Sequence, residues 1–380
     1  MIFFHLGRDK ELCKAEIEVQ VGSEVDKIHN EIVRVEIMKE FAAEWQRRLA
    51  GVVKISYPTS LVPFHDFETA CEVATGLVMS EMQGRAQRKD FACSIYGIKP
   101  YPRSKIDIWG MEVKQKLKAL GNTPVRYVRS KEPIVPSVML TKEKVLPHGV
   151  EINFIEDERG WWVSRTLTVQ DWKEWQMIDM HRPSFDLRSG ILPVKVAYQM
   201  VNLAGTHRMG VLWDPYCGSG TIMLAAAGLG WTKIIGSDIS PDALRHSTIV
   251  ADWVKNTYPL SEIHVTRADA QIADIQANVI VTEPYLGPAL HRRPTRYHAE
   301  RIRDGVITLY QGSVWNWAQR LPKGGIVVMC LPAWVTDDGM VHTSVSQVFS
   351  KESWEILSGP LWHFHPDHYV RRAIYRIRKI

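Results

Sequence analysis

The sequence predicts an α/β protein with a doubly wound, mostly parallel sheet in its C-terminal half and smaller α+β domains in its N-terminal half. From Val211 onward, short apolar stretches alternate with helix-like segments, which is typical of a parallel sheet with helices on both faces. The last two expected strands have no helix pattern between them, which indicates a closing hairpin. The first 165 residues instead mix strands and helices less regularly, as α+β domains do.

The expected elements of the C-terminal half are seven strands with helices between them. Strands are expected at residues 210–213, 233–237, 263–268, 279–281, 326–331, 354–357 and 369–378. Pro193 favours the first position of a helix, and helices are expected at residues 193–203, 222–229, 241–255 and 305–321.

The N-terminal half is expected to contain shorter elements. Strands are expected at residues 2–6, 28–38, 52–57, 91–96, 125–128, 138–140 and 150–154, and helices at residues 11–21, 39–49 and 111–120. In the last of these helices we expect Val113, Leu117 and Leu120 to point inward. Residues 166–192 are rich in Trp, Asp, Arg and Pro and are interpreted as an irregular connector.

Composition excludes several classes of protein. The five cysteines form no C-x-x-C pair, which argues against a disulfide framework and a structural zinc site, so no metal is expected. No apolar stretch reaches the roughly 18 residues of a membrane helix. The apolar run at residues 1–6 is too short for a signal-peptide core. These observations favour a cytoplasmic protein without a membrane partner.

Positive charge is concentrated in one block of the chain. The formal net charge is +5, whereas residues 85–144 hold 14 Lys and Arg against five Asp and Glu. Such asymmetry indicates either a face that binds a polyanion or a solvated basic surface. Candidate nucleic-acid contacts in the block are Lys114, Lys118, Arg126 and Arg129.

The first strand of the C-terminal half runs into a glycine-rich turn. Residues 214–221 read DPYCGSGT, and Gly218 and Gly220 would let the backbone turn sharply and approach a ligand. No Lys follows, so the turn is not a phosphate-binding P-loop, and the dinucleotide pattern G-x-G-x-x-G is broken. A carboxylate at Asp214 suits a cationic ligand, such as the amino group of a methionine moiety.

Two further acids follow the next two expected strands. Asp238 can accept hydrogen bonds from ribose hydroxyls, because Ser240 is available to cap the following helix. Asp269 can accept a hydrogen bond from an adenine amino group, although an Asp here can also cap its own loop.

Together these acids and the glycine turn resemble a class I S-adenosylmethionine-dependent methyltransferase with a Rossmann-like sheet. The resemblance implies S-adenosyl-L-methionine as cofactor. The residues it places around the cofactor are Asp214, Tyr216, Gly218, Gly220, Thr221, Asp238, Ile239, Asp269 and Ala270.

The fourth strand runs into Thr282, Glu283, Pro284 and Tyr285, which resembles the [N/D]-P-P-[Y/F] motif of methyltransferases acting on exocyclic base amines. Such an amine is a poor nucleophile, and two acceptors for its N–H groups can turn its lone pair toward the methyl donor. We assign Glu283 as side-chain acceptor and possible proton sink, the Pro284 carbonyl as second acceptor and Tyr285 as stacking platform. The sequence departs from the usual pattern by carrying Glu and a single Pro.

A basic loop follows this motif. Arg292, Arg293 and Arg296 could hold the phosphates that flank a flipped nucleotide. Solvated surface charge is the alternative interpretation. No cysteine lies in residues 282–290, which disfavours methyl transfer to cytosine C5.

The N-terminal half resembles the THUMP-domain tRNA guanosine-10 N2-methyltransferase family. The similarity is carried by residues 5–12 (HLGRDKEL) with 15–17, by residues 91–97, 117–129 and 149–153, and by the connector residues 165–166, 169–171, 182–183, 190–195 and 201–204. It implies a ferredoxin-like domain at 1–60, a THUMP RNA-binding domain at 61–165, a linker at 166–192 and a methyltransferase domain at 193–380. It also implies tRNA as partner, and some members need a small zinc-binding activator subunit.

The sequence therefore predicts a tRNA methyltransferase that modifies the exocyclic N2 of a guanosine, at position 10 by resemblance. Two alternatives stay open at this point. One is transfer to another base amine, such as adenine N6 in RNA or DNA. The other is a non-catalytic RNA-binding protein with a vestigial donor pocket.

Overall fold

A computed structural model describes residues 1–82, 89–99, 103–120, 124–181, 183–184, 192–365 and 367–380. The chain divides into two compact units. The first consists of Met1–Lys10, Glu24–Arg48 and Val52–Trp172, and the second of Glu11–Ser23, Leu49–Gly51 and Lys173–Ile380.

The first unit is built on one mixed sheet with the order β2-β3-β1-β4-β8-β7-β5-β6. Antiparallel pairing of β4 with β8 joins strands from the two predicted N-terminal domains into this single sheet. The strands are β1 (Ile2–Leu6), β2 (Asp26–His29), β3 (Ile32–Val35), β4 (Val52–Pro58), β5 (Lys89–Tyr96), β6 (Val125–Tyr127), β7 (Val150–Asp157) and β8 (Gly160–Val169).

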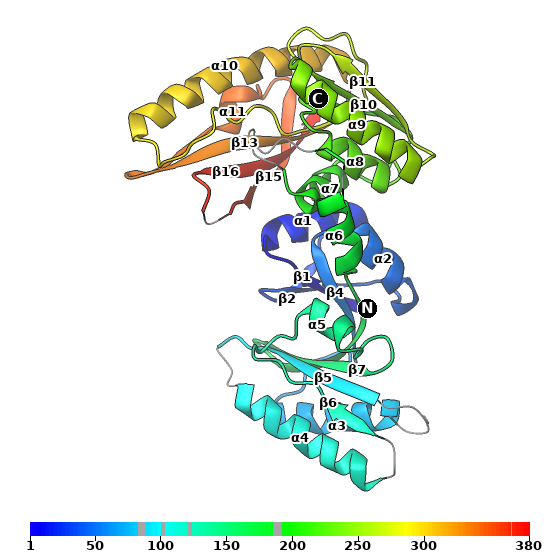
Figure 1. Cartoon of the computed structure of the whole chain (residues 1–380). Coiled ribbons are helices and arrows are strands. Elements are labelled where there is room, and N and C mark those ends of the chain that lie inside the picture. The colour runs from blue at the N-terminus through cyan, green and yellow to red at the C-terminus, as the bar shows by residue number, and fades with distance from the viewer. Residues whose placement is uncertain (83–88, 100–102, 121–123, 182, 185–191, 366) are drawn as a thin grey trace. The chain divides into compact units, whose positions relative to one another are not determined.

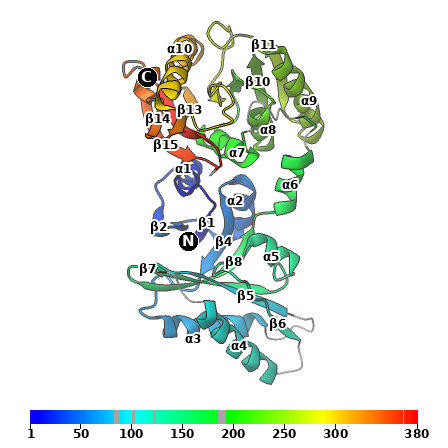
Figure 2. The ribbon, with the colours of Figure 1, turned by 60° about the vertical axis from the view of Figure 1, so that its left-hand side comes forward.

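Helices α3 (Phe67–Met82) and α4 (Arg103–Ala119) pack against β5, β7 and β8, as Figure 2 shows for β5 and β7. Their contact is a core that contains Phe91, Trp109 and Phe154. A short 3-10 turn, η1 (Lys39–Phe41), leads into α2 (Ala42–Arg48), and α5 (Ser137–Lys142) completes the unit's helices within the described residues.

Four details of the N-terminal half differ from prediction. Residues 138–140 lie in helix α5 and not in a strand, since so short an apolar run fits either structure. Residues 28–38 contain the end of one strand and a second strand, in a hairpin. Helix α4 begins at Arg103, and Leu120, just beyond its end, is 65% exposed.

The segment predicted as an irregular connector is also partly regular. It holds the end of β8 and helix α6 (Trp172–His181), whereas residues 182 and 185–191 lie outside the described residues. Trp175 and Ile178 of α6 are buried in the core of the second unit, which explains the helix within this Trp-rich stretch. The predicted domain boundaries themselves stay predictions.

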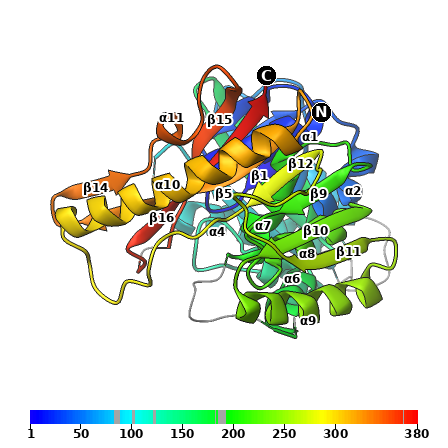
Figure 3. The ribbon, with the colours of Figure 1, turned by 90° about the horizontal axis from the view of Figure 1, so that it is seen from above.

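The second unit confirms the doubly wound sheet, with the order β11-β10-β9-β12-β13-β16-β15. Figure 3 shows β11, β10, β9 and β12 side by side. Strands β11, β10, β9, β12 and β13 run parallel to one another, and β16 pairs antiparallel with both β13 and β15. The strands are β9 (Val211–Asp214), β10 (Lys233–Asp238), β11 (Glu262–Arg267), β12 (Val279–Thr282), β13 (Ile326–Thr336), β15 (Trp354–His363) and β16 (Val370–Lys379), and β14 (Gly339–His342) extends β13 as a hairpin.

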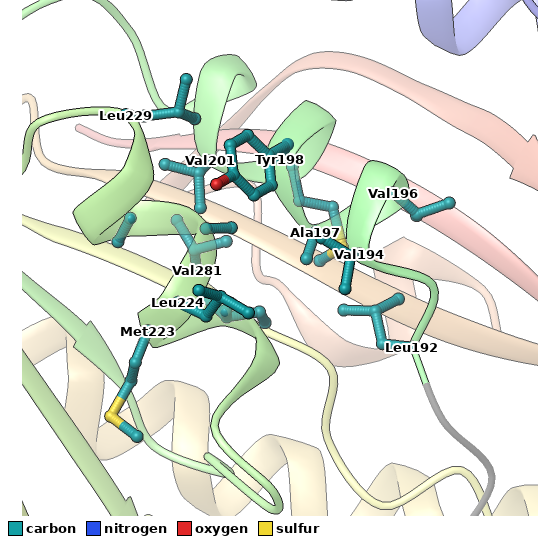
Figure 4. Packing of buried hydrophobic residues seen from close by; sticks show 14 of the residues in the cluster. Leu192, Val194, Val196, Ala197, Tyr198, Val201, Met223, Leu224, Leu229 and Val281 are labelled. Carbon is teal, nitrogen blue, oxygen red and sulfur yellow. The ribbon is translucent and has the colours of Figure 1, made fainter. Parts of the chain in front are cut away.

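Helices cover both faces of this sheet (Figure 1). One face packs against α7 (Val194–Leu203), α8 (Thr221–Gly228) and α9 (Pro241–Thr257), and Figure 4 shows Val201, Leu224 and Val281 in that core. The other face packs against α10 (Arg296–Arg320) and α11 (Val345–Val348). Helix α10 starts at Arg296 and not at Gly305 as predicted, because the Thr295 side chain caps it by accepting from the His298 amide.

Helix α1 (Lys10–Val21) belongs mostly to this second unit although it lies near the start of the chain. Its Glu16 is fully buried and accepts hydrogen bonds from the Ala50 amide at 2.9 Å, the Gly51 amide at 2.8 Å and the Asn202 side chain at 2.7 Å. Burial raises the pKa of Glu16 to about 7, against the opposing effect of these hydrogen bonds. One carboxyl group thus connects α1, the 49–51 turn and α7.

Replacing Glu16 tests this connection. Glu16→Ala leaves two buried backbone amides and the Asn202 amide without their acceptor, so we expect the free energy of unfolding to fall by about 3 kcal/mol. Chemical denaturation measures the change. Glu11→Ala, at an exposed position of the same helix, is the control and should stay within about 0.5 kcal/mol of wild type. Equal effects of the two substitutions would contradict the assignment.

Candidate functional site

The predicted site residues of the C-terminal half come together because parallel strands end at the same edge of a sheet. Asp214 on β9 is in register with Gly236 on β10, and Trp213 is in register with Ile280 on β12. The residues that follow these strands therefore lie side by side. Ligands of open α/β sheets bind in this position.

The glycine-rich turn between β9 and α8 has the left-handed backbone that its glycines allow. Gly218 has a φ of +49° and Gly220, which caps α8, has a φ of +85°. A Cβ at Gly218 would meet only the Tyr216 carbonyl, at 3.9 Å, so this side of the turn is open to a ligand. The Gly218 amide donates to Asp238 at 3.0 Å, which ties the turn to the end of β10.

Asp214 is buried at the end of β9. It accepts hydrogen bonds from the Thr282 hydroxyl at 2.8 Å and from the Tyr216 amide at 3.3 Å. Burial raises the pKa of Asp214 to about 8, the two hydrogen bonds oppose the rise, and the charges of Asp238 and Glu283 add to it. A nearby cation would therefore be stabilised strongly by this group.

Asp238 and Asp269 are half-buried and also organise their own loops. Asp238 accepts from the Ser240 amide at 2.9 Å as well as from Gly218. Ser240 caps α9, as predicted, by accepting from the Ala243 amide. Asp269 accepts from the Gln271 amide at 2.9 Å, so its loop-capping role exists beside any role in ligand binding.

The other residues assigned to the cofactor line the same turns. The Tyr216 hydroxyl is hydrogen-bonded to Ser313 at 2.6 Å, which fixes its ring against α10. Thr221 and Ala270 are buried, and Ile239 is 61% exposed. An exposed apolar side chain directly after Asp238 is available to contact a flat ligand.

The motif after β12 makes contacts that the sequence alone did not suggest. Glu283 forms an ion pair with Arg372 on β16. Pro284 is buried, and its carbonyl accepts no hydrogen bond from the described part of the chain. The Tyr310 hydroxyl donates to the Tyr285 carbonyl at 2.6 Å, and the Tyr285 ring is 54% exposed.

Sequence reasoning missed three of these contacts. Thr282, Tyr310 and Arg372 lie in apolar surroundings on β12, α10 and β16, where a polar side chain needs a partner. That need is the one signal that could have marked them. Cys330 on β13 is fully buried.

The predicted nucleic-acid contacts fall into two groups. Arg126 is bound in ion pairs with Asp90 and Glu143, Arg293 pairs with Asp337, and Arg296 with Glu300. The second group has no ion pair within the described chain and consists of Lys114, Lys118, Arg129 and Arg292. Lys114 is half-buried and the other three are exposed. These four are the cations most available to phosphates.

In the residues that the structure describes, no group of three or more His, Cys, Asp and Glu could hold a metal ion. None of the described helices is long and apolar enough to span a bilayer.

Comparisons with known proteins show which family part of the chain resembles. Residues 185–296 match the family described as RMKL-like, methyltransferase domain. The tRNA (guanine(10)-N2)-dimethyltransferase of Methanothermobacter thermautotrophicus is 25% identical over 194 residues, which are 48% of this chain and 51% of that protein. The protein of the same name from Methanocaldococcus jannaschii is 27% identical over 154 residues, or 36% of this chain and 41% of that protein. The chain thus spans about half the length of the curated relatives it matches.

A solved structure resembles the whole chain. TrmN from Thermus thermophilus has a TM-score of 0.56 at 16% identity, covering 100% of this chain and 99% of that one. This likeness concerns the fold. Residues 185–296 are thus similar to the RMKL-like methyltransferase domain, the chain has a Rossmann-like fold, and the predicted resemblance to the tRNA guanosine-10 N2-methyltransferases is confirmed as a similarity.

Proposed function

We propose that the protein is an S-adenosyl-L-methionine-dependent tRNA methyltransferase that transfers a methyl group to the exocyclic N2 of a guanosine at position 10. The observation that carries the proposal is the arrangement after β12. There the Glu283 carboxylate, the Pro284 carbonyl and the exposed Tyr285 ring follow a strand that neighbours buried Asp214. The names of the two archaeal relatives supply the base and its position.

The residues present fit the proposed cofactor. Asp214 would receive the ammonium group of the methionine moiety, and Asp238 the ribose hydroxyls. Asp269 would receive the adenine amino group, with Ile239 against the ring. The open side of Gly218 allows the close approach that such a ligand needs. When bound, the cofactor supplies an electrophilic methyl group on a sulfonium.

The chain's own residues would orient the amine. Its two N–H groups would donate to the Glu283 carboxylate and the Pro284 carbonyl, while Tyr285 stacks on the base. The Tyr310 hydroxyl holds the Tyr285 carbonyl and so fixes the backbone of the motif. Positioning of this kind can supply a large share of an enzyme's rate enhancement.

The first unit would contribute tRNA binding. Lys114 and Lys118 lie four residues apart on α4 and are not engaged in ion pairs within the described chain. Arg129 adds an exposed charge after β6. Contacts of this kind would select the tRNA by shape and charge.

The direct test is incubation of the protein with methyl-labelled cofactor and bulk tRNA, followed by digestion to nucleosides. The proposal expects label in N2-methylguanosine, and fragment mass spectrometry should locate it at position 10. Label in N6-methyladenosine would support the alternative base amine. Absence of cofactor binding by calorimetry would support the binding-protein alternative.

Removal of the side-chain acceptor should separate transfer from cofactor binding. For Glu283→Ala we expect kcat to fall roughly 100-fold or more, because the amine loses an acceptor that orients it. The dissociation constant for S-adenosylhomocysteine, measured by calorimetry, should change less than about threefold. A large loss of cofactor affinity would show that the role of Glu283 is misassigned.

Cofactor affinity should depend on pH through Asp214. Its pKa of about 8 means that the carboxyl is mostly protonated at pH 7, whereas an ammonium ligand requires the carboxylate. Affinity should therefore rise from pH 6 to about 8, by up to about tenfold per pH unit, and binding at pH 7 should release a proton. The rise ends near pH 8, where the ligand's own α-amino group loses its charge.

Calorimetry in buffers of different ionisation enthalpy measures both effects. Asp214→Asn should bind more weakly and with little pH dependence over this range. Wild-type affinity that stays constant from pH 6 to 7.5 would rule out an ammonium beside Asp214.

Charge reversal on α4 tests the tRNA surface. Lys114→Glu with Lys118→Glu should weaken tRNA binding and reduce the slope of log affinity against log salt by about 1 to 2, because phosphate contacts are lost. The control is Lys233→Glu with Lys323→Glu, an equal charge change at the first residue of β10 and shortly before β13, at the strand ends opposite the site. Equal effects of the two pairs would mean that only net charge matters.

A further inference from the structure

The ion pair between Glu283 and Arg372 is buried inside the candidate catalytic site. The Arg372 side chain is 9% exposed and the Glu283 side chain 14% exposed. Arg372 lies on β16, opposite Pro332 of β13, and β13 is also the strand next to β12. Arg372 therefore reaches the end of β12 from two strands away.

This contact differs from the other ion pair formed by the same strand. Arg378 pairs with Glu355 on β15, and both side chains are nearly half exposed, so water screens that pair. Burying Arg372 and Glu283 removes both charges from water, and this desolvation costs free energy that can exceed the attraction between them. Stability alone therefore does not explain the pair. The Glu283 carboxylate nevertheless raises the pKa of Arg372, although burial opposes the arginine's charge.

The contact also solves a geometric problem of the motif. Glu283 has one more methylene than the Asp or Asn usual at this position, and so one more rotatable bond. Arg372 Nε donates to Oε1 of Glu283, and Oε2 accepts no hydrogen bond from the described residues. One carboxylate oxygen is therefore held by the protein and the other is available to the substrate.

We propose that Arg372 is a positioning residue for methyl transfer, which anchors Oε1 of Glu283 so that Oε2 accepts an N–H of the substrate amine. The proposal rests on the proposed function of Glu283 and assigns a separate role to each of its carboxylate oxygens. The guanidinium occupies Oε1, so Glu283 orients the amine through Oε2. As the N–CH₃ bond forms and the S–CH₃ bond breaks, the amine proton leaves to water.

Three variants test the anchor. Arg372→Met removes it, Arg372→Lys keeps a charge with a different geometry, and Arg372→Met with Glu283→Asp removes the anchor and shortens the arm. We expect Arg372→Met to lower kcat roughly 100-fold, with the KM for tRNA and the affinity for S-adenosylhomocysteine changed less than about threefold. Arg372→Lys should recover part of the lost kcat, and the double variant should also recover part, because Asp lacks the extra rotatable bond that the anchor restrains.

The control and the stability measurement separate positioning from a purely structural role. Arg378→Met, in the exposed pair on the same strand, should keep wild-type kcat. If Arg372→Met unfolds, Arg372→Met with Glu283→Gln removes both buried charges and should fold, but should still transfer poorly. Full kcat in that folded double variant, or an equal loss of cofactor affinity and kcat in Arg372→Met, would overturn the proposal.

A readout without turnover keeps this test separate from that of the proposed function. A crystal structure of Arg372→Met, or of the Arg372→Lys variant if the former does not fold, should show the Glu283 carboxylate displaced while β12 stays in place. A carboxylate that remains in position without the guanidinium overturns the anchor, whatever base is methylated. Label in a nucleoside other than N2-methylguanosine overturns the substrate assignment and leaves the anchor to be judged by kcat on that product.

Discussion

The parallel pairing of β9, β10 and β12 is the constraint on which the rest of the site depends. It brings Asp214, Asp238 and Glu283 to one edge of the sheet although they are spread over 70 residues of sequence. The doubly wound connections require this placement, because each helix returns the chain to the same starting side. The fold therefore concentrates negative charge before any ligand is considered.

The three acids reduce the electrostatic repulsion between their charges in different ways. Asp214 is buried and has a raised pKa, so the neutral form becomes accessible. Asp238 uses both carboxylate oxygens to accept backbone amides from Gly218 and Ser240. Glu283 takes a guanidinium as partner. A cationic ligand fits best beside Asp214, which is buried and has no counter-charge among the described residues, and a neutral amine fits beside Glu283, which already has one.

The sequence predicted the parts of this arrangement that depend on local pattern. Seven strands of the second unit, the glycine turn and the acids after β9 to β12 follow from apolar periodicity and from residues adjacent in the chain. Arg372 could not be paired with Glu283 in this way, since 89 residues separate them and the contact depends on the antiparallel register of β16. Residues 138–140 were assigned wrongly for the opposite reason, because a three-residue apolar run carries too little periodicity.

Helix α1 shows a further limit of reading a sequence as consecutive domains. Its residues were interpreted as part of the first 60 residues, yet Leu12 and Ala15 belong to the core formed by α7 and α8. Glu16 adds hydrogen bonds to the 49–51 turn and to Asn202. Such a buried carboxyl is stable only while all its donors are present, since each donor offsets part of the cost of burying the group. The core of the second unit thus includes a segment from near the start of the chain, and part of what joins them is a polar interaction that hydrophobic periodicity does not reveal.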